Sequence, residues 1–266
     1  MFVGVAIDYR EKRRPVRAPS VSFTEYGGTL LTVIMATGER NWRVIVVGGH
    51  TRSIGKTQLV CDVIAAFPKA NWVAGKITQY GHGVCAQNGE NCDCAPDEHI
   101  CAISWEKRDD TGTDSARFLA AGARRSFWLR TKQGFLAEGM PLLRNALREI
   151  DANEGSEPAN LILESNTLLQ FLKPSLYLMV VHPGKADFKE SAHLQIDRAS
   201  AFVLREPLSS DIPGGQTTSS WTGVPLQLLR GKPQFLQREN EPLPSGLART
   251  VRETLGAQSS ALGIKL

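Results

Sequence analysis

The chain has 266 residues, with 31 Lys and Arg against 27 Asp and Glu, so its net charge is +4. At roughly 150 residues per domain, this length predicts one large domain or two small ones. Apolar residues make up 42% of the chain, a share typical of globular proteins, which excludes disorder over the whole chain. The small net charge argues against dedicated nucleic-acid binding, and no run approaches the roughly 18 consecutive apolar residues of a membrane span.

Residues 1–41 differ in character from the rest of the chain. They combine a basic, Pro-containing stretch with apolar patches and show no sustained period, so we expect a flexible or loosely docked extension, with Met35 as an alternative start. The apolar run Phe2–Ile7 precedes the basic residues, which is the reverse of a secretory signal. Four of the five Cys lie within residues 85–101, unlike the distribution of a disulfide framework. We therefore expect a cytoplasmic protein.

From residue 42 to residue 206, short apolar runs alternate with helical patterns. This order predicts an α/β fold in which a mostly parallel sheet is covered by helices on both faces. The expected strands are Arg43–Gly48, Trp72–Ile77, Ser126–Arg130, Asn160–Glu164, Leu176–Val181 and Ala201–Leu204. The expected helices are Lys56–Phe67, Asp114–Ala121, Met140–Asp151 with Pro141 in its first turn, and Glu190–Ala199.

Two segments interrupt this alternation. Residues 81–106 contain most of the cysteines and are interpreted as an insertion after the second strand. Residues 207–266 form a C-terminal extension, which is rich in Gly, Pro, Ser and Thr as far as Pro244. We expect this extension to pack on the same domain, with a last helix that starts at Ser245.

The motif with the most chemical content follows the first strand. The sequence GGHTRSIGKT occupies residues 48–57, and an amphipathic run comes directly after it. In a strand, glycine loop and helix of this kind, backbone N–H groups and the helix N-terminus surround a phosphate chain. Lys56 would reach the outer phosphates, and the Thr57 hydroxyl would bind Mg²⁺. The spacing departs from the usual one, because five residues rather than four separate Gly49 from Gly55.

The motif predicts a three-layer fold of the P-loop nucleoside triphosphate hydrolase type. The expected nucleotide-binding residues are Gly49, Thr51, Arg52, Ser53, Ile54, Gly55, Lys56, Thr57 and Gln58. Arg52 is a candidate for stabilising charge on a transferring phosphoryl group, with a surface Arg as the alternative. His50 could contact a phosphate or be a solvated loop residue. A glycine-rich turn that binds no phosphate remains the alternative for the loop as a whole.

Acidic residues near the loop are needed to hold the metal ion. Glu164 ends an apolar strand and is expected to bind Mg²⁺ through water or to orient an attacking water. A second acidic group comprises Asp109, Asp110 and Asp114. Among these we assign Asp110 to Mg²⁺ and Asp114 to the substrate. The alternatives are a solvent-facing Glu164 and an Asp-rich turn that caps a helix.

Four cysteines of the insertion form a compact group. Cys85, Cys92, Cys94 and Cys101 have the spacing C-x6-C-x-C-x6-C. Four thiolates match the ligand count of Zn²⁺ or of an iron–sulfur cluster, although the spacing is not that of a CxxC knuckle. A redox-active thiol pair and inert structural cysteines are the other two interpretations.

The order of these motifs resembles that of a known family. The GGHTRSIGKT loop, AGKIT at residues 74–78, DDTGTDSARFLAAGA at residues 109–123 and NLILES at residues 160–165 resemble the molybdopterin-guanine dinucleotide biosynthesis accessory proteins of the B type. More distantly, the loop is similar to that of dethiobiotin synthetase. The resemblance implies a P-loop fold, a role in molybdopterin cofactor biosynthesis, and a Lys76 that points into the active cleft. The cysteine-containing segment is not part of this resemblance.

These observations together predict an enzyme. We expect Mg²⁺-dependent binding of ATP or GTP, with hydrolysis or phosphoryl transfer in which Lys56, Glu164 and Arg52 are the catalytic residues. The second partner would be a small molecule or a cofactor precursor, with no nucleic acid and no membrane involved, and homodimerisation is expected by analogy. The alternative is a nucleotide-binding module that senses metal or redox state through its cysteines and has little hydrolysis of its own.

Overall fold

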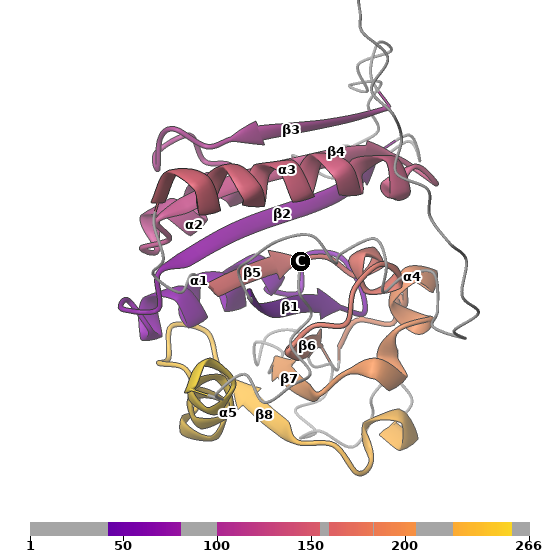
Figure 1. Cartoon of the computed structure of the whole chain (residues 1–266). Coiled ribbons are helices and arrows are strands. Elements are labelled where there is room, and N and C mark those ends of the chain that lie inside the picture. The colour runs from indigo at the N-terminus through magenta and orange to yellow at the C-terminus, as the bar shows by residue number, and fades with distance from the viewer. Residues whose placement is uncertain (1–41, 81–99, 155–159, 183, 206–225, 257–266) are drawn as a thin grey trace, which may run out of the picture.

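The computed structural model describes residues 42–80, 100–154, 160–182, 184–205 and 226–256. In these ranges the strands form one sheet in the order β3-β4-β2-β5-β1-β6-β7-β8 (Figure 1). The strands are β1 Arg43–Gly49, β2 Trp72–Tyr80, β3 Cys101–Trp105, β4 Arg125–Lys132, β5 Asn160–Glu164, β6 Leu176–Val181, β7 Ala201–Arg205 and β8 Gln234–Gln237. Neighbouring strands are parallel apart from the β3–β4 pair, which is antiparallel.

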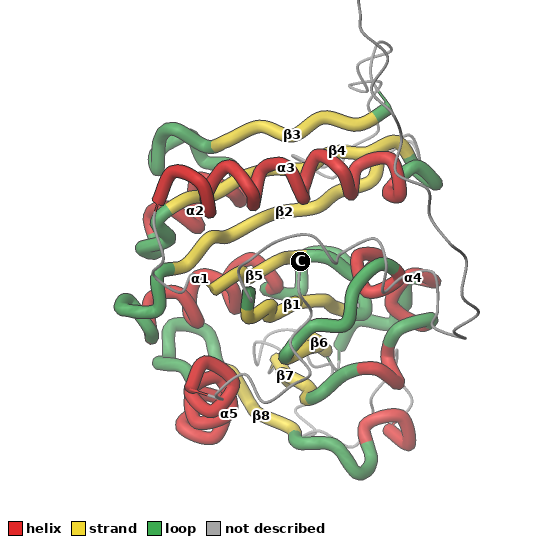
Figure 2. The backbone as a smooth tube through the Cα atoms, in the orientation of Figure 1, coloured by secondary structure: helices red, strands yellow, loops and turns green. Residues whose placement is uncertain are grey.

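Helices cover both faces of the sheet, which gives three layers (Figure 2). One face is covered by α1 (Lys56–Ala66), α2 (Asp114–Ala120) and α5 (Ser245–Gly256). The other face is covered by α3 (Leu136–Glu154), α4 (Glu190–His193) and the short 3-10 helices η1 (Thr167–Gln170) and η2 (Ile196–Arg198). The predicted α/β fold with a mostly parallel, doubly covered sheet is confirmed. Within the described ranges, no helix has the length and apolar character needed to cross a membrane.

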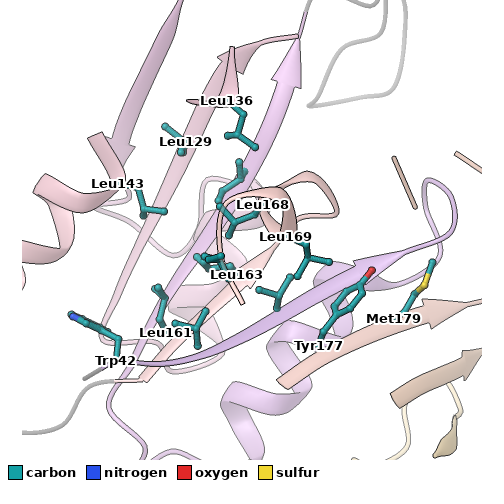
Figure 3. Close-up of a cluster of buried hydrophobic side chains, with 14 of the residues drawn as sticks. Trp42, Leu129, Leu136, Leu143, Leu161, Leu163, Leu168, Leu169, Tyr177 and Met179 are labelled. Atoms are coloured by element: carbon teal, nitrogen blue, oxygen red, sulfur yellow. The ribbon is translucent and has the colours of Figure 1, made fainter. Parts of the chain in front are cut away.

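The alternation of side chains along the central strands explains why two cores form. Val44 and Val46 of β1 belong to the cluster on the α3 side, whereas Ile45 and Val47 belong to the cluster on the α1 side. Successive side chains of a strand point to opposite faces, so a strand covered on both faces is apolar throughout. Figure 3 shows the α3-side cluster, in which Trp42 packs at the start of β1.

All six strands expected from the sequence are present, and two helices differ from expectation. The third helix begins at Leu136, so Pro141 lies inside it rather than in its first turn. The expected helix over residues 190–199 is interrupted at Gln195, which has φ −124° and ψ −1°. The Gln195 side chain accepts a hydrogen bond from Arg198, whose guanidinium also donates to the Leu169 and Leu172 carbonyls. This tertiary contact favours two short turns over one helix.

Two strands were not expected. Residues 101–105, interpreted as part of the insertion, form edge strand β3 and pair with β4. Ile103 and Trp105 pack against the α3-side core, and the Trp105 ring meets Phe127 edge-on at 5.5 Å. Strand β8 pairs with β7 and begins and ends with Gln, so its composition gave little strand signal. Residues 1–41 and 81–99 lie outside the described ranges.

Candidate functional site

The GGHTRSIGKT loop connects β1 to α1 at the carboxyl end of the sheet. Strand β1 lies between β5 and β6, with β2 on one side and β7 on the other. From β1 the chain builds the sheet outward toward β2 on one side, and later strands extend it toward β7 on the other side. In open parallel sheets, ligands bind at the carboxyl ends of the strands where the strand order reverses in this way. The arrangement of strand, glycine loop and helix is the one that P-loop proteins use.

Lys56 folds back over this loop. Its Nζ donates a hydrogen bond to the Thr51 carbonyl at 2.9 Å. The lysine stem crosses Gly49 so closely that a Cβ on Gly49 would lie 2.9 Å from Lys56 Cδ. Burial lowers the pKa of Lys56, while the Glu164 carboxylate opposes that shift. The ammonium thus completes the loop rather than projecting into solvent.

Gly55 sets the direction of the first turn of α1. It has φ +85°, in the left-handed region that glycine tolerates best, and no side chain among the described residues caps the helix. The N–H groups of the first helical turn have no intrahelical partners. The start of α1 therefore presents backbone donors on the loop side.

Four polar side chains form a chain of contacts at the base of the loop. Thr57 Oγ1 donates to Glu164 Oε2 at 2.7 Å, and Lys76 Nζ donates to Glu164 Oε1 at 3.0 Å. Lys76 also pairs with Asp114. Burial by itself would lower the pKa of Lys76, but Glu164 and Asp114 outweigh it and raise the pKa. The two carboxylates therefore keep Lys76 charged.

The Thr57–Glu164 pair has the chemistry of a Mg²⁺ site. Its two oxygen groups are buried at the head of α1. Mg²⁺ prefers oxygen ligands and binds proteins through one or two carboxylates together with substrate phosphates. A buried carboxylate needs compensating positive charge, which Lys76 supplies in part. These residues fit the predicted ion.

The backbone at the start of the loop is held by Asn166, which sequence reasoning did not select. Its Oδ1 accepts from the Gly49 N–H at 2.8 Å, and its Nδ2 donates to the Gly49 carbonyl at 2.9 Å. Asn166 follows β5, which lies next to β1 in the sheet. A polar residue two positions beyond a predicted central strand was the available signal.

His50 is a structural residue. Its ring is fully buried, with Nε2 donating to the Lys185 carbonyl at 3.2 Å and Nδ1 accepting from the His182 N–H at 3.4 Å. Burial lowers the pKa of His50, which favours the neutral ring that these two bonds require. Of the two alternatives for His50, the solvated loop residue is wrong, because the segment after β6 covers the ring. Both ring nitrogens have partners within the protein.

The segment between β6 and α4 packs on the loop through three consecutive residues. Asp187 accepts a hydrogen bond from Thr51 Oγ1, and the Phe188 ring meets His50 edge-on at 5.8 Å. The Lys189 N–H donates to the His50 carbonyl at 2.8 Å. Burial, followed by repulsion from Lys56 and Arg52, lowers the pKa of Lys189 to about 8. Lys189 is a further cation near the loop, and no sequence motif pointed to it.

The other residues predicted to bind nucleotide differ in their exposure to solvent. Arg52, Ser53 and Gln58 are exposed, whereas Ile54 is buried in the α1-side core. The Gln58 side chain donates to Asp62. The groups that this part of the loop offers to a ligand are therefore its backbone and the exposed Arg52 guanidinium.

Asp110 is not brought to this site. Its carboxylate is exposed and pairs with the Arg108 guanidinium at 2.7 Å. Asp114, four residues on, is the acidic residue that reaches Lys76. The helix start at Asp114 turns its side chain toward β2, and Thr113 caps that helix by accepting from the Ala116 N–H at 3.1 Å.

Most of the predicted cysteine cluster cannot be placed. Cys85, Cys92 and Cys94 lie outside the described residues. Cys101 is half-buried on β3, and its Sγ lies 3.5 Å from the Glu138 carbonyl. In the ranges that the structure covers, no three His, Cys, Asp or Glu side chains are grouped as a metal site would require.

Comparison of the sequence with protein-family models and with curated proteins gives no match. Solved structures with similarity include LpxK from Aquifex aeolicus in complex with ATP, with 15% identity, a TM-score of 0.41, and coverage of 78% of this chain and 58% of LpxK. HypB from Helicobacter pylori in complex with nickel has 13% identity and a TM-score of 0.43, over 81% and 86% of the two chains. A zinc-bound mutant of the YjiA GTPase has 12% identity and a TM-score of 0.38, over 78% and 61%. This chain therefore spans less than two thirds of LpxK and of YjiA.

Proposed function

We propose that this protein is a Mg²⁺-dependent P-loop nucleoside triphosphatase or phosphoryl transferase that uses ATP or GTP. The observation that supports this most directly is the Lys56 ammonium, which lies 2.9 Å from the Thr51 carbonyl and closes the loop at the head of α1. A polyphosphate would accept hydrogen bonds from the loop N–H groups and from Lys56 in place of that carbonyl.

Each charged residue then has a role in positioning or stabilising charge. Lys56 would neutralise charge on the terminal phosphate, and Arg52, exposed on the same loop, would approach it from solvent. Thr57 and Glu164 would hold Mg²⁺, which supplies charge neutralisation and orientation of the phosphates. Lys76 pairs with the Glu164 carboxylate at 3.0 Å and holds it in place. Catalysis of this kind depends on positioning and electrostatics.

The second substrate is a small molecule or a cofactor precursor in this proposal. The resemblance to the molybdopterin-guanine dinucleotide accessory proteins supports a role in molybdopterin cofactor biosynthesis. The proposal that the protein binds a nucleotide does not depend on this role in cofactor biosynthesis.

Lys56→Ala tests the assignment of the loop. Turnover of MgATP or MgGTP should fall by about 100-fold or more, because a preorganised donor to the reacting phosphate is removed. The stabilisation of wild-type protein by each nucleotide in thermal unfolding identifies the preferred one. Lys69→Ala, an exposed lysine beyond α1, is the matched control and should behave as wild type. Unchanged turnover in Lys56→Ala would reject the site.

Glu164→Gln tests the metal site separately. The amide keeps the shape of the side chain and can still accept from Thr57, but it lacks the charge that Mg²⁺ requires. We expect the Mg²⁺ concentration for half-maximal turnover to rise at least about tenfold. Titration of Mg²⁺ at saturating nucleotide measures this change, and an unaltered Mg²⁺ requirement would remove Glu164 from the metal site.

A further inference from the structure

A cavity of about 270 Å³ lies beside the proposed nucleotide site. It is lined by Lys76 of β2, Trp128 of β4 and residues 111–115 leading into α2. Lys76 lies between this cavity and the loop. It forms an ion pair with Glu164, and Glu164 accepts a hydrogen bond from Thr57 of the loop. A molecule in the cavity would therefore be adjacent to the residues proposed to hold Mg²⁺.

Trp128 is the aromatic residue in the lining of this cavity. Its indole N–H already donates to Thr78 Oγ1 at 2.8 Å. The Arg130 guanidinium lies 5.0 Å from the ring centroid, and this cation–π contact helps to fix the ring. Because the indole has one donor and that donor is used, the ring can contribute only carbon surface to a ligand. Such a surface favours a planar ring.

Lys76 and Asp114 supply complementary hydrogen-bonding capacity. An ammonium has three N–H donors. Lys76 donates one to Glu164 and one to Asp114, which leaves one N–H without an acceptor among the described residues. The Arg117 guanidinium lies 3.7 Å from Asp114 Oδ1, beyond hydrogen-bond distance. A single hydroxyl group could accept from Lys76 and donate to Asp114. The Asp114 carboxylate disfavours an anionic group at the same place.

We propose that this cavity binds the second substrate, a small planar molecule whose ring lies on Trp128 and whose hydroxyl group lies between Lys76 and Asp114. The inference rests on the proposed function, because the hydroxyl would be the phosphoryl acceptor. Its oxygen forms a bond to the terminal phosphorus, the bond from that phosphorus to the nucleoside diphosphate oxygen breaks, and the hydroxyl proton passes to the Asp114 carboxylate. The cavity volume suits a small molecule rather than a macromolecule.

The probe for this site is 2-naphthol, compared with 2-methoxynaphthalene, which lacks the donor, and decahydro-2-naphthol, which is not planar. The five Trp residues give separate indole N–H signals in ¹⁵N-labelled protein, and Trp128→Phe identifies the signal of Trp128. We expect 2-naphthol to shift that signal to saturation. The other two probes should bind at least about tenfold more weakly, since each lacks one of the two contacts. Equal binding of all three would overturn the inference.

Trp105 provides a matched control. It lies on β3, outside the cavity lining, and also has an arginine over its ring, Arg125 at 4.4 Å. Calorimetric titration follows 2-naphthol binding in these variants, because the Trp128 variants lack the Trp128 indole signal. Trp128→Leu should weaken 2-naphthol binding at least about tenfold, Trp128→Phe should restore most of it, and Trp105→Leu should leave it unchanged. Equal weakening in both Leu variants would overturn the inference. If Trp128→Leu does not fold, the selectivity among the three probes in wild-type protein decides.

A titration of MgADP on the same labelled sample separates the two proposals. Saturable 2-naphthol binding at Trp128 without any binding of MgADP would overturn the proposed function, and with it the acceptor role. Binding of MgADP together with unselective 2-naphthol binding would overturn the cavity inference alone. Binding of MgADP together with selective binding of 2-naphthol supports both the proposed function and the cavity inference.

Discussion

Gly49 permits the Lys56 side chain to lie over the loop. A Cβ at this position would lie 2.7 Å from Ile54 Cδ1 and 2.9 Å from Lys56 Cδ. Both atoms are near the ends of flexible side chains, so the protein can relieve the contact by moving them. The lysine, however, cannot move without losing its place above the loop.

Gly49→Ala should therefore weaken nucleotide binding while leaving the stability of the fold almost unchanged. We expect the free energy of unfolding to change by less than about 1 kcal/mol, because side-chain ends can shift. Nucleotide affinity should fall at least about tenfold, because Lys56 is displaced. Chemical denaturation and nucleotide titration on the same preparation measure the two effects. A large loss of stability with normal affinity would show that the contact is rigid.

Lys189 makes the stability of the ligand-free protein depend on pH. The pKa of this group is about 8 in the folded chain against 10.5 in the reference state, since burial and the nearby Lys56 and Arg52 outweigh the attraction of Asp187. Between these values the unfolded chain binds more protons, so this group's contribution to stability rises with pH. The stability of wild type relative to Lys189→Met should increase from pH 7 to pH 10. Lys185→Met, an exposed lysine of the same segment, is the control.

The same lysine predicts proton uptake on nucleotide binding. A polyphosphate near Lys189 would raise its pKa, so binding near pH 8 should take up a fraction of a proton. Calorimetric titration in two buffers of different ionisation enthalpy measures that fraction. Lys189→Met should abolish it, and uptake that persists in this variant would place the polyphosphate away from Lys189.

At the scale of the elements, β2 is held tightly against its neighbours at Gly75. A Cβ there would overlap Phe127 Cζ and lie 2.8 Å from Leu163 Cδ2, and both atoms belong to the buried α3-side core. The Phe127 ring and the Leu163 side chain are buried in the core and cannot move aside as the side-chain ends near Gly49 can. Gly75→Ala should therefore cost about 1–3 kcal/mol of stability, as overpacking does. Thermal or chemical unfolding measures the loss, and a neutral effect would indicate that β2 can shift.

Elements with a clear pattern in their own sequence could be predicted. Elements that form because they pair with a distant strand could not. The β1–loop–α1 unit combines a buried apolar strand, glycines and a largely buried helix within one continuous stretch. Strand β3 has five residues, and its place follows from pairing with β4 and from the contact of Trp105 with Phe127. The interruption at Gln195 depends on Arg198 reaching the Leu169 carbonyl, which no local pattern encodes.

At the scale of the molecule, the central strands should be the most stable part of the fold. Strands β5, β1 and β6 are buried along almost their whole length, whereas edge strands β3 and β8 are partly exposed. Amide hydrogen exchange reflects such differences in local opening. Exchange should therefore be slowest in β5, β1 and β6 and faster in β3 and β8. Uniform exchange across the sheet would contradict this order.

The GGHTRSIGKT loop could be recognised from the amino-acid order, because the groups proposed to bind phosphate come from neighbouring residues. The loop donors, Lys56 and Thr57 lie within ten positions of one another. The short-range physics of glycine conformation and helix starts is sufficient to bring them together.

The surroundings of that loop were decided by folding over long distances. Asn166 holds Gly49 from 117 positions away, and Lys189 reaches the loop only because β6 lies beside β1. Trp128 meets Lys76 because β4 and β2 are paired in one register. Sheet order and register bring these side chains together, and neither is encoded by any single segment, since each strand could pair with several others until the whole core is packed.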